Sequence, residues 1–186
     1  MKTALKEWAI LIDAFARGEI ILTLRKGGIR EQRAAFSVRH DRFLLYPTFF
    51  HEKAAELDAR FHGRLDQVER PPEDVIPFEF VAEVAGLWRI DDLSVLERIQ
   101  PMQGLTLAAL ESRFHYRNKP GVQAIALRIS RLTRRVLVPE TRRYLGCVSW
   151  VNLDADLDVS EAVPVLQLDE FKTRLAAIAA LLGSPD

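Results

Sequence analysis

The sequence predicts an α+β fold, in which a mixed, mainly antiparallel sheet is flanked by helices and can curl into a barrel. Helical and strand-like segments alternate along the chain, but most connections between them read as hairpins or excursions rather than regular crossovers. Of the 186 residues, 48% are hydrophobic, which is ample material for a core. We therefore expect a single domain over residues 1–186, with a soft internal break at 70–74, where two prolines interrupt the chain.

The first half of the chain predicts two helices around a pair of strands. Residues 3–17 keep an apolar helical stripe behind a threonine cap, and Gly18 ends this helix. Residues 20–24 are apolar on both faces, as in a central strand, and they can pair with residues 43–46 as a hairpin. Residues 48–68 predict the second helix, because their apolar positions keep the helical period for several turns.

The second half predicts shorter elements and a last, alanine-rich helix. Apolar and acidic residues alternate over 78–88, which indicates a half-buried strand. The remaining elements follow from capping residues, turn residues and apolar periods. They are helices over 92–99 and 106–114, a turn over 118–121, strands over 122–132 and 147–153, further strands near Val136 and Val165, and a helix from Asp169. The alanines of the last helix allow close packing against the sheet or against a second copy.

Charge and cysteine content limit the classes of function. Lys and Arg number 26, as do Asp and Glu, so the formal net charge is zero and only local patches can bind a polyanion. The single cysteine, Cys147, rules out an internal disulfide and fits a reducing compartment. The N-terminal apolar stretch is far shorter than the ~20 residues of a membrane span and no signal peptide is apparent, so we expect a cytoplasmic protein without membrane contact.

The most informative stretch is a glycine pair set among cations between the two expected hairpin strands. Glycines let a backbone approach a phosphate closely, and Arg and Lys side chains hold the phosphate oxygens. The hairpin would bring a second polar cluster, at the end of the next strand, to the same end of the sheet. The predicted ligand-binding residues are Arg25, Lys26, Gly27, Gly28, Arg30, Tyr46 and Thr48. The alternative is a charged hairpin turn in which the glycines only supply positive φ.

Two neighbouring residues, His51 and Glu52, are the candidate catalytic residues. A histidine near the start of a helix can act as an acid, a base or a ligand near neutral pH. The alternative is structural, because a carboxylate such as Glu52 stabilises a helix N-terminus through the helix dipole. The histidines and the cysteine show no metal-ligand spacing, and the glycines match neither a Walker nor a dinucleotide pattern, so we expect no metal and no cofactor.

A second basic region runs from Arg113 to Arg143, where Glu140 is the only acid. Aromatic residues interleave with the cations at 114–116, a mixture that proteins use to stack and neutralise single-stranded nucleic acid. The predicted contacts in this region are Arg113, Tyr116, Arg117 and Lys119. The alternative is that the acidic residues of 154–161 neutralise this region within the fold.

Four blocks of the sequence resemble the uncharacterised bacterial family called domain of unknown function 1802. The blocks are Ala4-Leu5-Lys6-Glu7-Trp8-Ala9, Leu24-Arg25-Lys26-Gly27-Gly28-Ile29, Tyr46-Pro47-Thr48 and Gly146-Cys147-x-Ser149-Trp150. The likeness covers nearly the whole chain. It implies no assigned activity, only a connection with restriction–modification that domain association suggests for the family.

A fainter likeness is to the PUA-like barrels, particularly the ASCH group thought to bind RNA. Of the signature Gly-x-Lys-x-x-Glu-x-Arg, this chain keeps Gly18 and Arg25, with Ile20 in place of the lysine and Thr23 in place of the glutamate. The likeness implies a PUA-like barrel and nucleic-acid binding, whereas the two replacements argue against a catalytic role of that group.

The leading hypothesis is therefore a protein that binds RNA, DNA or a nucleotide, with Arg25, Lys26 and Arg30 on phosphate. The first alternative is an enzyme acting on a small phosphorylated or nucleotide substrate, with His51 or Glu52 as the acid–base group. The second alternative is a non-catalytic interaction module that forms a homodimer through its C-terminal helix.

Overall fold

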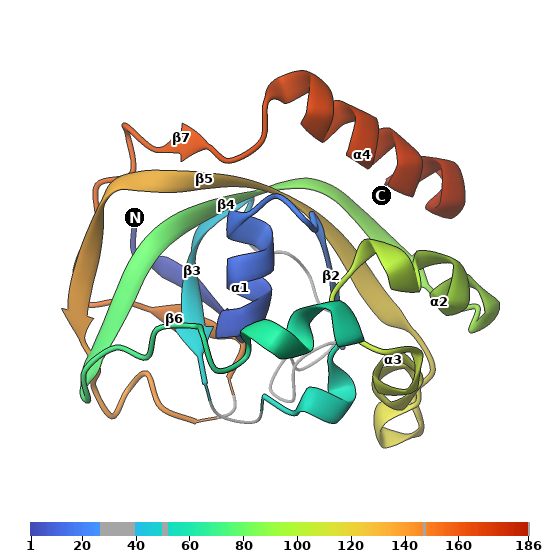
Figure 1. The fold of residues 1–186 in the computed structure, drawn as a ribbon, viewed down its shortest axis with the longest axis horizontal. Helices are drawn as coiled ribbons and strands as arrows, with labels where there is room; N and C mark the ends of the chain where they lie inside the picture. Colours follow the sequence, from blue (N-terminus) through green and yellow to red (C-terminus); the bar gives the residue numbers. More distant parts are fainter. Residues whose placement is uncertain (27–39, 50–51, 147, 186) are drawn as a thin grey trace.

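A computed structural model of the chain describes residues 1–26, 40–49, 52–146 and 148–185. A mixed sheet curls through the molecule as a half-barrel, with helices packed on it (Figure 1). Its strands are β1 (Thr3–Trp8), β2 (Leu22–Arg25), β3 (Arg42–Thr48), β4 (Val75–Ile90), β5 (Val122–Pro139), β6 (Trp150–Asn152) and β7 (Val163–Pro164). The predicted fold class, α+β with a curled, mainly antiparallel mixed sheet and flanking helices, is confirmed.

The strand order in the described residues is β2-β5-β4-β3-β1-β6, and β7 pairs with β5. Every pair is antiparallel except β1 with β3. The long strands β4 and β5 shift register after Phe78 and again after Val84, and such irregularities bend and twist a strand pair. Gly86 follows the second shift, where a Cβ would lie 2.3 Å from the ring of Trp88, so close packing of this bend requires glycine.

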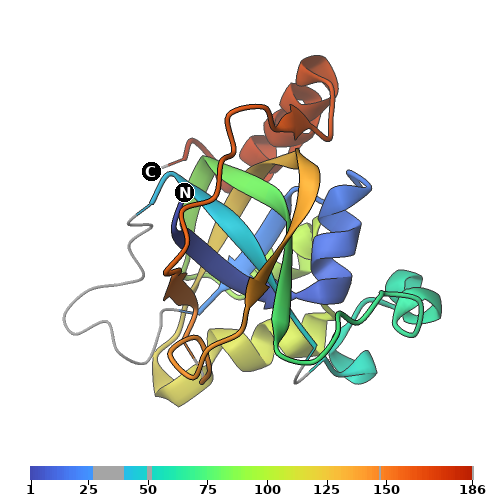
Figure 2. The same cartoon turned by 90° about the vertical axis from the view of Figure 1, so that its left-hand side faces the viewer.

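Helices cover both sides of the bend. The α-helices are α1 (Ala9–Ala16), α2 (Ser94–Ile99), α3 (Leu107–Phe114) and α4 (Leu168–Leu182), and 3₁₀ helices span Ala54–Glu56, Ala59–Arg64, Gln100–Met102 and Tyr116–Asn118. Helix α1 lies under the arch of β4 and β5, and α4 lies over it on the other side (Figures 1 and 2). Six of the eight residues of α1 are buried, so this helix fills the concave side of the sheet.

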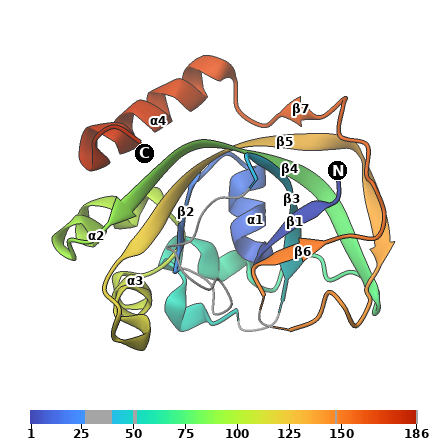
Figure 3. The same ribbon diagram turned by 180° about the vertical axis from the view of Figure 1, so that it is seen from behind.

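Two groups of buried apolar side chains hold the elements together. The larger joins α1, β2, β5, α2, α3 and α4 around residues such as Phe15, Leu22 and Ile125. The smaller group lies under β1, β3 and the first half of β4, around Leu44, Phe78 and Tyr144. Seen from behind, the N-terminal strand β1 lies between β3 and β6 (Figure 3). It contributes Leu5 to the larger group and Ala4 to the smaller one.

The helix expected over 3–17 is half wrong. Residues 3–8 form β1, which pairs with β3 on one side and β6 on the other, and the helix begins only at Ala9. Pairing with two neighbouring strands, which buries Ala4 and Leu5 in the core, outweighs the local helical stripe. The end was predicted well, since Gly18 follows the helix with a φ of +66°.

The hairpin expected between 20–24 and 43–46 is also wrong. Strand β2 pairs with β5, whereas β3 pairs with β1 and β4. Strand β2 is an edge strand in the strand order rather than a central one, yet Leu22, Thr23 and Leu24 are all buried. The curl of the sheet explains this, because it brings β1 opposite β2 and covers the edge.

The helix expected over 48–68 is replaced by extended backbone and two short 3₁₀ helices. Leu57 forms an isolated bridge with Leu105 and Phe61 enters the core, so the apolar residues that suggested a helix are buried without one. Farther on, the expected helices over 92–99 and 106–114 match α2 and α3, with Thr106 as the cap of α3. The expected strand over 122–132 extends to Pro139, and that over 147–153 is reduced to β6.

Candidate functional site

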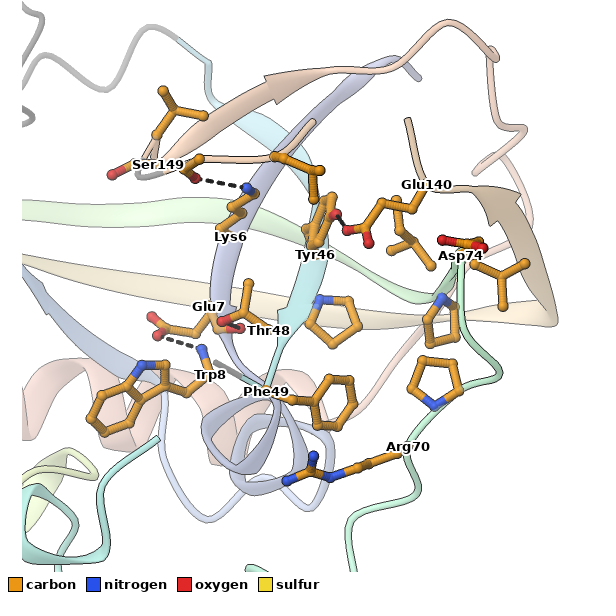
Figure 4. Close-up of a pocket in the computed structure, with 18 of the residues that line it drawn as sticks. Lys6, Glu7, Trp8, Tyr46, Thr48, Phe49, Arg70, Asp74, Glu140 and Ser149 are labelled. Atoms are coloured by element: carbon orange, nitrogen blue, oxygen red, sulfur yellow. Dashed lines mark hydrogen bonds between the residues drawn. The ribbon is translucent and has the colours of Figure 1, made fainter. Parts of the chain in front are cut away.

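A pocket of about 1030 Å³ opens where β1, β2 and β3 end. Its walls come from these strand ends, from residues 70–77 at the start of β4, from α3, and from the segment that precedes β6. Figure 4 shows Glu7 and Trp8 on one side of this strand-end pocket, and Glu140 and Asp74 on the other. The volume is at the upper end of the ~300–1,000 Å³ range of small-molecule sites.

The buried carboxylate of Glu7 organises one end of the pocket. Its side chain is 6% exposed, and Oε2 accepts a hydrogen bond of 3.0 Å from the Thr23 hydroxyl and lies 3.2 Å from Arg25 Nη2. Its other oxygen accepts a bond of 2.9 Å from the amide of Trp8, and Thr48 donates to the Glu7 carbonyl oxygen over 3.0 Å. The carboxylate is therefore paired and hydrogen-bonded, as a buried charge must be.

Two guanidinium groups surround this carboxylate, so the Glu7 end of the pocket has a positive balance. Arg25 also donates to the carbonyl oxygen of Lys6, while its Nε is buried without a hydrogen-bond partner in the described residues. Arg113 donates to the Leu24 carbonyl oxygen over 3.1 Å, and its guanidinium carbon lies 5.6 Å from the Trp8 ring centre. Burial lowers the pKa of Arg113, which Glu7 partly opposes. We call Glu7, Trp8, Arg25 and Arg113 the basic end.

The ammonium group of Lys26, next to the basic end, has a structural role. It donates to the carbonyl oxygens of Phe114 at 2.8 Å, of Gly121 at 2.7 Å and of Lys119. Three donors thus meet three acceptors, which ties the end of β2 to the connection between α3 and β5. Burial and the nearby Arg89 lower the pKa of Lys26.

The opposite end of the pocket carries acidic groups. The Tyr46 hydroxyl donates to Glu140 Oε1, and burial, together with this hydrogen bond, raises the pKa of Tyr46. Lys6 Nζ lies 5.2 Å from the Tyr46 ring centre and donates to the carbonyl oxygens of Tyr144 and Gly146. Glu73 and Asp74 line the pocket nearby. We call Glu73, Asp74 and Glu140 the acidic end.

Aromatic and basic side chains that are partly or fully exposed form the mouth of the pocket. The guanidinium carbon of Arg70 lies 5.7 Å from the Phe49 ring centre, an arrangement that Figure 4 shows. Tyr116 is 44% exposed and lines the pocket from the 3₁₀ turn after α3. The backbone of Arg117 continues this turn, and the exposed Lys119 follows it without lining the pocket.

The structure therefore brings six predicted ligand-binding residues to one pocket: Arg25, Lys26, Tyr46, Thr48, Arg113 and Tyr116. The expected hairpin does not bring these residues together. Strands β2 and β3 are not paired, and the curl of the sheet brings their ends to the same pocket. Gly27, Gly28, Arg30 and His51 lie outside the described residues.

Glu52, a candidate catalytic residue, caps a helix. Its Oε1 accepts a hydrogen bond of 3.1 Å from the amide of Ile10 at the start of α1, and the Ala9 amide also bonds to this carboxylate. Burial raises the pKa of Glu52, while these helix amides and Arg70 oppose the shift. The helix dipole role expected for Glu52 thus applies to α1 rather than to a helix of its own segment.

Sequence reasoning missed Glu7, Trp8, Arg70 and Glu140 as pocket residues. Glu7 had one available signal. When residues 3–8 are read as a strand, Glu7 is their only acid and falls on the same face as the apolar Leu5. Among the described residues, no group of three or more His, Cys, Asp or Glu is arranged to hold a metal ion. No helix within the described part is long and apolar enough to cross a membrane.

The family described as "Domain of unknown function (DUF1802)" matches residues 4–177, so the chain belongs to this family. Two solved structures are similar in fold. The crystal structure of ASCH from Zymomonas mobilis has 12% identity and a TM-score of 0.45, over 95% of this chain and 94% of that one. A serine-to-alanine mutant of the same Zymomonas mobilis protein has 15% identity and a TM-score of 0.39, with the same coverage. A search among curated proteins finds no match.

Proposed function

We propose that the protein binds single-stranded RNA or DNA, with the strand-end pocket as the binding site. The observation that carries this proposal is that the guanidinium groups of Arg70 and Arg113 line the same pocket as the rings of Trp8, Phe49 and Tyr116. Aromatic faces stack unpaired bases, and arginines neutralise phosphates or stack on bases themselves.

The concave shape of the site favours a single strand over a duplex. A base can reach an aromatic face inside a pocket only when it is unstacked from its neighbours, as in single-stranded nucleic acid. The net charge of zero also argues against extended duplex binding, which depends on many phosphate contacts.

The cations differ in how they contribute. Arg70 is exposed at the mouth, where it can reach a phosphate, and Tyr116 offers a stacking surface in the same pocket. Arg113 and Arg25 act from the basic end, where Glu7 balances part of their charge. Lys26 shapes the pocket through its three carbonyl partners. Gly27, Gly28 and Arg30, which follow Lys26 in the sequence, and Arg117 and Lys119 beside Tyr116, stay predicted contacts.

The test is fluorescence anisotropy of labelled single-stranded RNA, single-stranded DNA and duplex DNA at two salt concentrations. We expect both single strands to bind more tightly than the duplex, with a salt slope of roughly −0.7 per phosphate contact. Arg70→Ala and Tyr116→Ala should each weaken binding about tenfold, since one stacked base is worth about 1–3 kcal/mol. Arg98→Ala is the matched control, because Arg98 is an exposed arginine of α2 outside the pocket.

The proposal is wrong if no oligonucleotide binds at low salt. It is also wrong in its site if the Arg70 and Tyr116 variants bind as tightly as the Arg98 variant. Binding that is equal for duplex and single strands would reject the stacking role of the aromatic residues.

An enzyme acting on a small phosphorylated or nucleotide substrate is the second candidate. One observation favours it, since the carboxylates of Glu7 and Glu140 line the pocket together with arginines, and such pairs of groups can support acid–base chemistry. Turnover of nucleotides that is lost in His51→Ala, with a changed pH–rate profile, would support the catalytic role predicted for His51.

A further inference from the structure

The strand-end pocket has opposite charge at its two ends. Arg25 and Arg113 outnumber Glu7 at the basic end. At the acidic end, three carboxylates outnumber the one ammonium group, that of Lys6 beside Tyr46. In Figure 4, Glu140 and Asp74 lie across the pocket from Glu7 and Trp8. A ligand with an anionic part and a hydrogen-bond-donating part would therefore lie in one direction in this pocket, because carboxylates repel a phosphate and arginines attract it.

The pocket also has an apolar lining that suits a flat ring. The residues Pro47, Pro71, Pro77, Ile76 and Leu145 line it, and the ring of Tyr46, which holds Glu140, lines it too. Leu145 is 52% exposed, so this residue has apolar surface left to cover. A nucleobase is a planar group that buries such surface while its polar edge stays free for hydrogen bonds.

Glu140 is the best-placed group to form a hydrogen bond with the polar edge of such a base. The Tyr46 hydroxyl holds one carboxylate oxygen, and no donor of the described residues bonds to the other, Oε2. Tyr46 is itself fixed by an edge-to-face contact with Phe78, at 5.8 Å between ring centres. A carboxylate held in this way has a free acceptor in a defined direction, which is what selective hydrogen bonding requires.

We infer that the acidic end binds one base of the strand and prefers bases with an exocyclic amino group. The inference rests on the proposed function, since it assumes that the pocket takes nucleic acid. Glu140 Oε2 accepts a hydrogen bond from the amino group of cytosine or adenine, and the neighbouring phosphate lies toward Arg25 and Arg113. Uracil and hypoxanthine present a carbonyl oxygen at the same position, which a carboxylate repels.

Matched pairs of ligands test this preference. Cytidine and uridine monophosphates share one ring and differ at the exocyclic group, and adenosine and inosine monophosphates differ in the same way. In competition against a labelled single strand, we expect the amino member of each pair to bind about tenfold more tightly, because only that member donates a hydrogen bond to the charged acceptor.

The decisive variant is Glu140→Gln. An amide can accept from an amino group or donate to a carbonyl, so both affinity ratios should fall to about one. The backbone bond from the Glu140 amide to the Asp74 carbonyl does not depend on this side chain. Glu97→Gln on α2 is the control, because Glu97 is an exposed acid outside the pocket, and its ratios should match those of the wild type.

The outcomes separate the two claims. Equal affinity for both members of each pair, with binding intact, overturns the inference and leaves the proposed function standing. A preference that survives in Glu140→Gln shows that another group reads the base and also overturns it. If the wild type binds no nucleotide and no oligonucleotide, both claims fail.

Discussion

Glu7 and Arg25 connect two strands that are far apart in the sheet. Glu7 Oε2 lies 3.2 Å from Arg25 Nη2, although β1 and β2 are separated in the strand order by β5, β4 and β3. The Thr23 hydroxyl adds a second link between the same strands at 3.0 Å. Side chains rather than backbone hydrogen bonds therefore join the two sides of the half-barrel, and this junction forms the basic end of the pocket.

Replacing Glu7 by Gln should destabilise the protein by about 3 kcal/mol. The amide keeps the size of the side chain but leaves the guanidinium of Arg25 without its counter-charge in a buried place, and Arg113 stands close by. Urea unfolding followed by tryptophan fluorescence measures the change in the free energy of unfolding.

The control for this substitution is Glu79→Gln. Glu79 lies 3.5 Å from Arg131 and 3.4 Å from Arg135 in partly exposed pairs, which typically contribute less than about 1 kcal/mol. If the Glu7 and Glu79 variants lost the same free energy, the junction between β1 and β2 would not depend on the Glu7 charge.

Replacing Lys26 by Met separates a structural role from a binding role. Three carbonyl oxygens lose their donor, so the free energy of unfolding should fall by about 1–2 kcal/mol. Lys119→Met is the control: its exposed side chain lies outside the pocket, and its effect on stability should stay within about 0.5 kcal/mol. A Lys26 variant with unchanged stability and weaker binding of nucleic acid would instead favour Lys26 as a phosphate contact.

Homodimerisation through α4 stays a prediction. Phe171 and Ile178 are buried within the chain, and the Trp88 indole donates to the Gly183 carbonyl oxygen over 2.9 Å, so the apolar stripe of α4 is already used. A dimer would use the exposed face of α4, which carries Leu168 and alanines such as Ala177. Sedimentation should then show a concentration-dependent dimer that Ala177→Glu dissociates, and a monomer at every concentration would reject this interface.

The fold class could be predicted from sequence, but the strand pairing could not. Strand β1 ends at Trp8 and helix α1 begins at the next residue, Ala9. No glycine, proline or turn residue marks this boundary in the sequence. Its strand conformation depends on partners at residues 44–48 and 150–152. Such non-local pairs outweigh local propensity, and one sequence alone does not disclose them.

The candidate site was predictable where its pattern is local. Arg113 and Tyr116 stand three residues apart in a basic and aromatic run, and both line the pocket. Glu7 pairs with Thr23 across 16 residues through the curl of the sheet. Arg70 lines the pocket from a segment that follows extended backbone and two short 3₁₀ helices instead of the expected helix. These positions follow from tertiary structure, which explains why sequence patterns missed them.

The cap that Glu52 provides for α1 predicts a pH dependence of stability. Burial raises the pKa of Glu52 above its ordinary value of 4.5, so just above that pH the folded protein holds this proton more tightly than the unfolded chain does. The contribution of Glu52 to the free energy of unfolding is then complete below pH 4.5 and is lost as the pH rises through the raised pKa. Glu52→Gln removes this titration but keeps an acceptor for the amide of Ile10.

The difference in the free energy of unfolding between wild type and Glu52→Gln measures this contribution. As the pH rises above 4.5, the free energy of unfolding of the wild type should fall relative to that of Glu52→Gln. The difference should level off once Glu52 is ionised in the folded state. A difference that grows with pH would mean that the α1 amides and Arg70 lower the pKa of Glu52 by more than burial raises it. Glu52 would then act as a charged cap, because the attraction between its carboxylate and the N-terminal amides of α1 would outweigh the cost of removing the carboxylate from water.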